Sequence, residues 1–423
     1  MDIEGSVAPG FERVRDIFAS FWLESELGAS VCAYYRGEKV VDLWAGYKDA
    51  AREDPWLADT LVNVYSTTKG LAALAIAVLY DEGLIDYTAP VAQYWPEFGA
   101  AGKSKVTVAE LLAHKAGVSA VDQTLAVEDL YNWQKMTNLI AAQAPLWSPG
   151  KASGYHAVTW GYLPGELIKR ITGESLGAYF RRKIGEPLQA DCYIGLPDAE
   201  HDRCATLNGP NRARRNFDST LAHKEKQSPT LHPPQDQTSS DLYKQSMLNP
   251  VIAPFKHACS PEWRRAEIAA SNGHASARGL AKIYATLSMQ GALSGTRILS
   301  SGAIDAATLS EVETSKDLVM NSMIRRSRGF ILNTDGNYGP NSKAFGHNGT
   351  GGSTAFADRE NGVSLAYVMN QMLSNSMLVF IKLRLVFMKL TLVLKTLAGT
   401  KMKKRSMINL SGNGMKVISV SPW

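Results

Sequence analysis

Residues 63–80 have the sequence NVYSTTKGLAALAIAVLY, and this stretch constrains the fold more than any other. From Leu71 to Tyr80 the chain is apolar on every side of a helix, and a helix without a polar face must be buried. Ser66 and Lys69 lie three positions apart at its start, so their side chains share one face and can touch. The sequence therefore predicts a buried helix with a serine and a lysine at its N-terminal end.

Lys69 breaks a local rule of helix formation. An ordinary capping box has Glu or Gln three residues after the serine, and a cation in the first turn opposes the helix dipole. A purely structural explanation, in which Ser66 caps the helix and Lys69 is incidental, therefore does not agree with this sequence pattern. Burial and the positive helix end both lower the pKa of Lys69, and an uncharged amine can take the proton from Ser66. A bare S-x-x-K is common by chance, so the assignment of Ser66 as a nucleophile needs further motifs.

The segments around this helix indicate an α+β protein. Ser30 to Trp44 alternates around Arg36-Gly37-Glu38 and predicts a β-hairpin. A second hairpin is expected from Thr350 to Ala357 and from Val363 to Asn370, joined through Asn-Gly. The stretch between the hairpins is mainly helical in pattern, and its part from Leu207 to Pro254 is polar and rich in Pro, Ser and Gln. We expect that part to be a long surface loop.

Composition and charge exclude several classes of function. Of 423 residues, 45% are hydrophobic and 20% charged, which is typical of a soluble globular enzyme. The net charge is +5, but nine Lys or Arg and no acidic residue follow Glu360, so residues 1–360 carry a net charge of −4. We therefore expect no nucleic-acid partner. Four widely spaced cysteines and a start without a secretory pattern predict free thiols and a cytoplasmic location.

Four sequence motifs occur along the chain in the order and with the approximate spacing of a known protein family. They are Ser66-Thr67-Thr68-Lys69, Val106 to Gly117, Trp147-Ser148-Pro149-Gly150 with Tyr155-His156-Ala157, and Gly346 to Gly352. Together they resemble the serine β-lactamase-like and penicillin-binding-protein superfamily of the class C type. The similarity covers about Phe11 to Met372 and is closest to the carboxylesterase-like branch and the β-lactamase-domain proteins of animals.

The resemblance implies a β-lactamase/DD-peptidase-like fold, in which an antiparallel sheet is flanked by helices and accompanied by an all-helical domain. Residues 1–80 and 265–372 would then form a discontinuous α/β domain. Residues 81–264 would form the helical domain, including the expected loop at 207–254. Residues 373–423 form an atypical tail that is both basic and apolar.

The same resemblance assigns roles to individual residues. Ser66 would be the acylated nucleophile, Lys69 its general base and Tyr155 the second member of the proton relay. A phenol beside a lysine can be held partly ionised and can return a proton to the leaving group. The backbone N–H groups of Ser66 and Thr350 would form the oxyanion hole, with Gly349 allowing close approach of a ligand. No cofactor and no metal are expected.

Two departures from the family pattern bear on the substrate. The β-lactamase asparagine two residues after the tyrosine is replaced by Ala157, and the K-T-G triad is replaced by His347-Asn348-Gly349. A mostly neutral imidazole attracts a carboxylate poorly. We therefore expect a serine hydrolase that acts on small-molecule esters or small amides. A true β-lactamase or D-peptidase and an inactive, self-assembling scaffold remain the alternatives.

A second serine motif and several histidines are further candidates for the site. Gly173 to Gly177 matches G-x-S-x-G, but a helical run precedes it, so we expect Gly173 to end one helix and Ser175 to cap the next. His114 and His274 are expected to be structural. His156 and His347 are expected to line the site, together with Asn348.

The tail from Ser374 onward allows three interpretations. Lys382, Arg384, Lys389 and Lys395 interrupt its apolar run, which disfavours a membrane-spanning helix. A basic helix on a membrane surface is a second interpretation, and membrane contact is not favoured. We prefer the third, a poorly formed or alternative C-terminus.

Overall fold

The computed structural model describes residues 2–24, 26–209, 237–314 and 316–373. The interpretation of the tail therefore lies outside the described residues. No helix within those ranges is long and apolar enough to cross a membrane.

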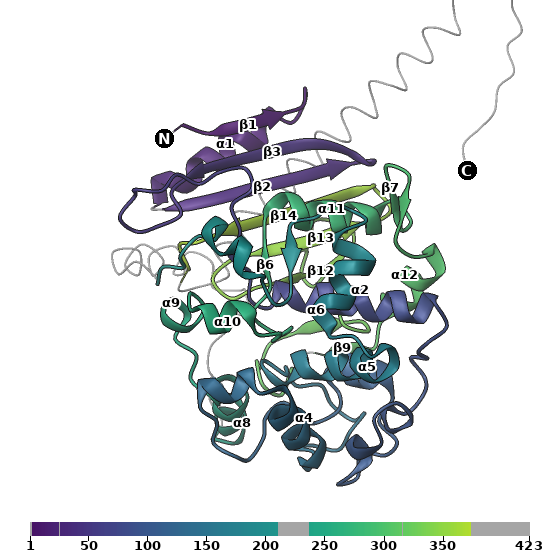
Figure 1. The fold of residues 1–423 in the computed structure, drawn as a ribbon. Coiled ribbons are helices and arrows are strands. Elements are labelled where there is room, and N and C mark those ends of the chain that lie inside the picture. The colour runs from purple at the N-terminus through teal and green to yellow at the C-terminus, as the bar shows by residue number, and fades with distance from the viewer. Residues whose placement is uncertain (1, 25, 210–236, 315, 374–423) are drawn as a thin grey trace, which may run out of the picture.

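A single antiparallel sheet organises the fold (Figure 1). Nine strands of the described residues take part. In spatial order they are β1 (Glu4–Val7), β3 (Glu38–Gly46), β2 (Gly28–Tyr35), β14 (Val363–Met369), β13 (Thr354–Asp358), β12 (Phe345–Asn348), β11 (Ile331–Leu332), β10 (Ile324–Arg326) and β9 (Val312–Thr314). Both expected hairpins are confirmed as β2–β3 and β13–β14. Segments far apart in the sequence meet near the centre of the sheet, because β14 pairs with β2.

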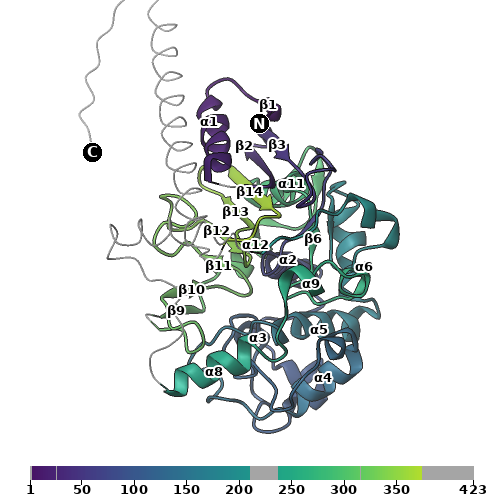
Figure 2. The ribbon, with the colours of Figure 1, turned by 90° about the vertical axis from the view of Figure 1, so that its left-hand side faces the viewer.

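Helices cover both faces of this sheet. The side chains of β14 alternate: Tyr367 faces Phe21, which follows α1 (Glu12–Ser20), while the Ser364 hydroxyl donates to Ala281 O of α11 (Ala277–Ser288). Figure 2 shows α1 and α11 on opposite sides of the strands. Because both faces are covered, every residue of β14 is buried.

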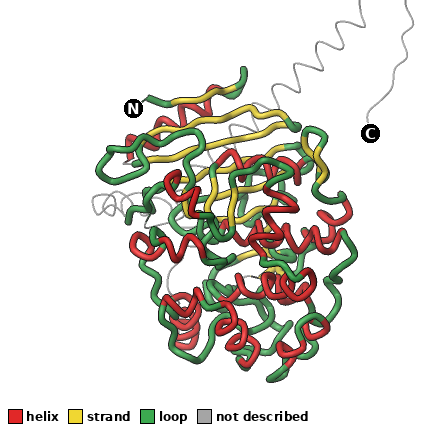
Figure 3. The backbone as a smooth tube through the Cα atoms, viewed as in Figure 1, coloured by secondary structure: helices red, strands yellow, loops and turns green. Residues whose placement is uncertain are grey.

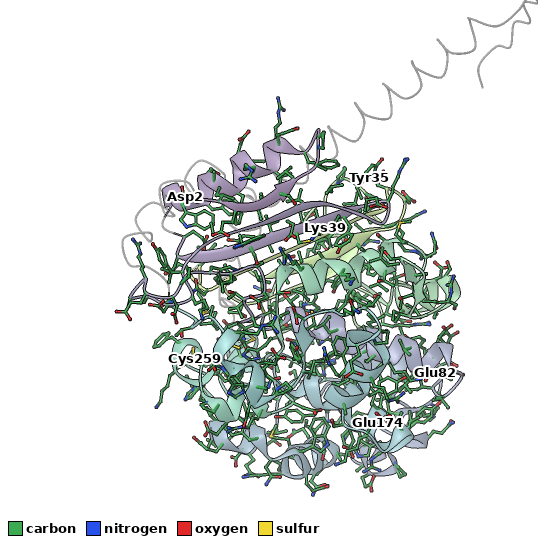
Figure 4. All side chains as sticks on the ribbon, turned by 45° about the horizontal axis from the view of Figure 1, so that its top comes forward. Asp2, Tyr35, Lys39, Glu82, Glu174 and Cys259 are labelled. Carbon is green, nitrogen blue, oxygen red and sulfur yellow. The ribbon has the colours of Figure 1, made fainter. Side chains whose placement is uncertain are left out.

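The predicted central helix is α2 (Thr67–Asp81), and thirteen consecutive residues from Thr67 to Leu79 are buried. It packs against β12, α5, α6 and α12. Its C-terminal end reaches the surface at Glu82, labelled in Figure 4, where the carboxylate pairs with Lys183. Its N-terminal end, with Ser66 and Lys69, lies inside the molecule.

The remaining helices gather mostly on the other side of α2 from the sheet, as Figure 3 shows by colour. Their bounds are α3 (Val108–Leu112), α4 (Trp133–Ala142), α5 (Tyr162–Thr172), α6 (Leu176–Phe180), α8 (Gln237–Met247), α9 (Pro254–His257), α10 (Pro261–Arg265) and α12 (Ser301–Ala307). Two small sheets complete the described structure: β4 (Val62–Asn63) and β5 (Cys192–Tyr193) with β6 (His274–Ala275), and β7 (Ala292–Leu293) with β8 (Thr296–Arg297). The division into two domains stays a prediction.

The expected loop at 207–254 is wrong for its second part, where α8 forms. Tertiary contacts hold this polar helix in place. The Ser246 hydroxyl is buried 2.7 Å from that of Ser119, and the Asn249 carboxamide binds the backbone of Leu125. Such contacts lie far apart in sequence and override weak local propensity. Residues 210–236 of the expected loop lie outside the described residues.

Candidate active site

Ser66 sits at the N-terminal end of α2 without acting as its cap. The helix has no side-chain cap hydrogen bond at this position, so Ser66 Oγ is not tied to the backbone of the first turn. The preceding residue, Tyr65, is buried with a φ of 44°, a left-handed conformation that is strained for an aromatic residue. Thr68 fixes the same turn, because its Oγ1 accepts from the Gly273 N–H at 2.9 Å. The fold therefore aims Ser66 Oγ away from a capping role.

Lys69 is fully buried and contacts three oxygen atoms. Its Nζ lies 2.8 Å from Ala270 O, 3.0 Å from Ala157 O and 3.3 Å from Ser66 Oγ. Burial, and then the charge of Arg326, hold the pKa of Lys69 well below its ordinary value. An uncharged amine has two N–H donors and one lone pair. In this form the two carbonyls can accept both N–H groups and the lone pair is left for the Ser66 hydroxyl, whereas the protonated amine donates to all three oxygen atoms.

Tyr155 joins this pair from the segment between α4 and α5. Its hydroxyl donates to Ser66 Oγ at 2.7 Å, and Lys69 Nζ lies 4.8 Å from the centre of its ring. Burial raises the pKa of Tyr155 to about 12, despite the opposing hydrogen bond with Ser66. The expected partial ionisation of the phenol is therefore not supported. At neutral pH Tyr155 is a hydrogen-bond donor and a potential acid.

The segment between β12 and β13 lies against the N-terminal end of α2. The Ser353 hydroxyl donates to Val64 O at 2.7 Å, and it lies 3.1 Å from Thr67 Oγ1. A Cβ on Gly349 would stand 2.2 Å from Val64 O, so only glycine permits this approach. Thr350 is exposed beside it. Within the described ranges, the structure records no hydrogen bond from the backbone N–H of Ser66 or of Thr350.

His347 and Asn348 of β12 are held by hydrogen bonds within their own strand and with the neighbouring strand β13. His347 is buried, and its Nδ1 lies 2.9 Å from Asn348 O, so Nδ1 carries the proton and Nε2 is left as an acceptor. Burial, followed by the charge of Lys69, lowers the pKa of His347 to about 3. The imidazole is therefore uncharged at neutral pH. Asn348 Oδ1 accepts from Thr354 Oγ1 at 2.6 Å, which fixes its carboxamide along the strand.

His156 is engaged by the backbone instead of facing a ligand. Its Nδ1 lies 2.7 Å from Gly154 O, and its Nε2 accepts from the Val118 N–H at 3.1 Å. With both nitrogens occupied, the contacts of His156 do not support its expected role in substrate binding. His114 is structural in its contacts, as expected: its Nδ1 accepts from the backbone N–H of His156 at 3.0 Å and its ring packs on Tyr155. His274 is buried in β6, where it has a packing role.

The G-x-S-x-G motif forms a helix junction, as expected. Gly173 ends α5 with a φ of 77°, and the Ser175 side chain accepts from Ala178 N at the start of α6. The Ser175 hydroxyl also donates to Glu267 Oε1 at 2.6 Å. No strand leads into this serine, so the nucleophile elbow of an α/β-hydrolase is not formed.

Sequence reasoning missed a buried ion pair behind Tyr155. Arg326 Nη1 lies 2.7 Å from Asp317 Oδ2, and both side chains are almost fully enclosed. The guanidinium carbon lies 5.7 Å from the centre of the Tyr155 ring. In the sequence, Arg326 stands in the run Arg325-Arg326-Ser327-Arg328, where charge alone would suggest a solvated segment. Only the strand alternation of β10, which turns Arg326 inward and Arg325 outward, could have separated these residues.

The arrangement has the parts that acyl transfer requires. The Ser66 hydroxyl contacts an amine with a lowered pKa and a protonated phenol, and the backbone N–H groups of Ser66 and Thr350 make no hydrogen bond within the described residues. A base and an acid can therefore act at the serine oxygen, while N–H donors remain available for negative charge on a substrate carbonyl oxygen.

Comparisons with known proteins agree with this geometry. Residues 14–382 match the family model described as Beta-lactamase. Esterase/beta-lactamase LipL of Mycobacterium tuberculosis is 35% identical over 378 residues, which are 88% of this chain and 83% of that protein. A solved structure of a family VIII carboxylesterase is 43% identical, with a TM-score of 0.81, and the match covers 91% of this chain and 99% of that one. The expected antiparallel α+β fold is confirmed.

The expected closeness to animal proteins is weakly supported. The human mitochondrial serine beta-lactamase-like protein LACTB is 30% identical over 118 residues, which are 26% of this chain. The bacterial relative above matches more than three times as much of the chain at higher identity. On the extent of the family match and on the fold, this chain belongs to the beta-lactamase family.

Proposed function

We propose that this chain is a serine hydrolase that cleaves carboxylic esters through an acyl-enzyme on Ser66. One observation carries the proposal: the fully buried Lys69 amine, whose pKa is held well below its ordinary value, lies 3.3 Å from Ser66 Oγ. A serine hydroxyl is a weak nucleophile until a base removes its proton, and an amine with a lowered pKa can do so at neutral pH. The names of the relatives, an esterase/beta-lactamase and a carboxylesterase, support the same reaction class.

Acylation then follows from the positions of these groups. Lys69 Nζ takes the proton from Ser66 as Oγ forms a bond to the ester carbonyl carbon. The carbonyl oxygen becomes an oxyanion that accepts from the N–H groups of Ser66 and Thr350. As the C–O bond to the alcohol breaks, Tyr155 donates its proton to the leaving oxygen and recovers one from the Lys69 ammonium. The products are the free alcohol and an ester of Ser66.

Deacylation repeats the same steps with water. Lys69 or the Tyr155–Lys69 relay accepts a proton from the attacking water, and Ser66 Oγ leaves with that proton restored. The acid is released and the enzyme returns to its starting state. All protons are accounted for by side chains of this chain.

The environment of His347 favours esters over β-lactams. A β-lactam carries a carboxylate that the family lysine attracts, whereas the His347 imidazole is uncharged at neutral pH. The place of the family asparagine is taken by Ala157, whose methyl side chain cannot form a hydrogen bond with a substrate amide. We propose esters with an uncharged acyl group as substrates. Cytoplasmic location stays a prediction.

The first test is labelling with a fluorophosphonate probe and turnover of p-nitrophenyl acetate. We expect the wild-type protein to be labelled and Ser66→Ala to lose both labelling and turnover. Ser175→Ala is the matched control, because this serine belongs to the rival motif and lies at a helix junction. It should retain both activities. Labelling that persists in Ser66→Ala and disappears in Ser175→Ala would refute the assignment.

A further inference from the structure

The loop that carries Asp317 and the strand that carries Arg326 both contact Tyr155. Asp317 Oδ1 accepts from the backbone N–H of Tyr155 at 3.2 Å and from the N–H groups of Val319 and Met320 at 2.9 and 2.7 Å. Asp317 Oδ2 faces Arg326 Nη1. One enclosed carboxylate therefore connects the loop, the strand and the residue that donates to Ser66.

Arg326 reinforces this connection without being fully paired. Its Nη1 also donates to Ser153 Oγ at 2.6 Å, two residues before Tyr155, and Leu318 N donates to Ser153 O at 3.0 Å. Arg326 Nε and Nη2 make no hydrogen bond within the described residues, although only 2% of the side chain is exposed. An enclosed guanidinium with two unpaired nitrogens is costly to folding. Its charge is thus only partly offset.

We propose that Arg326 and Asp317 are positioning residues that set the orientation of Tyr155 and the protonation of the Ser66–Lys69–Tyr155 site. Asp317 supplies the anchor, and Arg326 supplies a positive charge behind the phenol ring. The inference rests on the proposed hydrolase function and assigns a role to two residues that do not touch the reacting atoms.

The charges around Tyr155 make this role specific. The titratable groups that face it from every neighbouring element are Lys69 of α2, His114 after α3, the adjacent His156, Asp317, Arg326 of β10, Tyr338 and His347 of β12. The three imidazoles are held neutral by burial, since their pKa values are all lowered. The pKa of Lys69 is lowered as well. Arg326 and Asp317 form the ion pair that contacts Tyr155, Arg326 through the ring and Asp317 through the backbone N–H.

Opposite changes to the pair should shift the pH profile in opposite directions. Arg326→Met leaves the Asp317 carboxylate alone, which favours the protonated amine of Lys69 and moves the acid limb of kcat/KM up by about one pH unit. Asp317→Asn keeps an oxygen for the three backbone donors but leaves Arg326 alone, so the limb moves down by a similar amount. The double variant should return toward the wild-type position.

The measurement is kcat/KM for p-nitrophenyl acetate against pH, normalised to the fraction of sites that react with a fluorophosphonate. Arg325→Met is the matched control. Arg325 is the neighbour on β10, and its guanidinium pairs with the exposed carboxylate of Glu313, so removing it should not move the limb. Arg326→Lys keeps the charge and should keep the limb in place while kcat falls. Melting temperatures are recorded for all variants.

The proposal would be overturned if the acid limb of the kcat/KM profile stayed in place in both single variants. It would also be overturned if the limb moved in the same direction in both. If one single variant does not fold, the other is sufficient for the test, because the proposal requires the acid limb to move up in Arg326→Met and down in Asp317→Asn. Failure of the proposed function has a different signature: the wild-type protein itself would then neither react with the probe nor hydrolyse the ester.

Discussion

Burial of Lys69 opposes folding, because an enclosed ammonium loses its hydration and no carboxylate lies among its contacts in the described residues. The folded chain responds by lowering the pKa of the amine. The unfolded chain holds the same proton up to about pH 10.4. Between these two pKa values the unfolded state binds more protons, so stability rises with pH over that window. The property that makes Lys69 a base is thus a cost to stability at neutral pH.

Replacing Lys69 by Met tests this opposition directly. Methionine removes the desolvated amine but leaves Ala157 O and Ala270 O without a donor, at about 1 kcal/mol each. We expect kcat to fall by about a hundred- to ten-thousand-fold, as for loss of a general base. The stability of the variant relative to wild type should be greatest at low pH and should decline as pH rises toward about 10.4.

Urea unfolding of both proteins from pH 6 to pH 10 measures this difference. Lys103→Met is a useful comparison, since that amine is also enclosed and donates to two carbonyls, of Ala100 and Gln143, but lies outside the proposed site. It should preserve kcat. A Lys69→Met variant whose relative stability rises with pH would contradict the lowered pKa.

At the scale of elements, the site depends on how closely the β12–β13 turn approaches α2. A methyl group at Gly349 would meet Val64 O and Ser353 Oγ at 2.2 Å each, so the turn must move away. We expect Gly349→Ala to cost about 1–3 kcal/mol of stability, as for overpacking. Displacement of the Thr350 N–H should lower kcat by about a hundredfold or more, as for loss of an oxyanion donor.

Gly302→Ala is the control for this substitution. Gly302 lies in the first turn of α12, and the nearest atom to its added methyl group would be Ser300 Oγ at 3.8 Å. Alanine should be neutral there or should stabilise the helix by up to about 1 kcal/mol. Kinetics and thermal melting of both variants provide the comparison. Unchanged activity in Gly349→Ala would show that the turn does not position a catalytic group.

Elements with a local signal could be predicted from the sequence. The buried helix is marked by its continuous apolar run, and both hairpins are marked by alternation and by their turns. By contrast, α8 was predicted as a loop because its local helix signal is weak. Contacts from Ser119 and Leu125, more than a hundred residues away in the sequence, hold the helix. The same limit applied to the site. The contact between Ser66 and Lys69 could be predicted because the two residues lie in one helical turn. The roles of Asp317 and Arg326 could not be predicted, because only the tertiary structure brings β10 and its neighbouring loop to Tyr155.

At the scale of the whole molecule, one core joins the sheet to the helices on the other side of α2. Buried residues of β14, of α2 and of α5 belong to a single hydrophobic cluster. Because α2 contacts both β12 and α5, neither part can unfold without exposing it. The predicted helical domain at 81–264 is therefore not expected to be stable by itself.

We accordingly expect a single cooperative unfolding transition. In urea, tryptophan fluorescence, to which Trp44 of β3 and Trp160 on the helical side both contribute, should change in one step at the same midpoint as the far-ultraviolet circular dichroism of the whole chain. Loss of esterase activity should coincide with both, because Ser66 and Lys69 are on the shared helix and Tyr155 arrives from the helical side. Two separated midpoints would instead show that the two predicted domains unfold independently. Activity that disappears before either spectroscopic change would place the weakest contacts at the β12–β13 turn, where the site depends on the close approach of Gly349 to Val64.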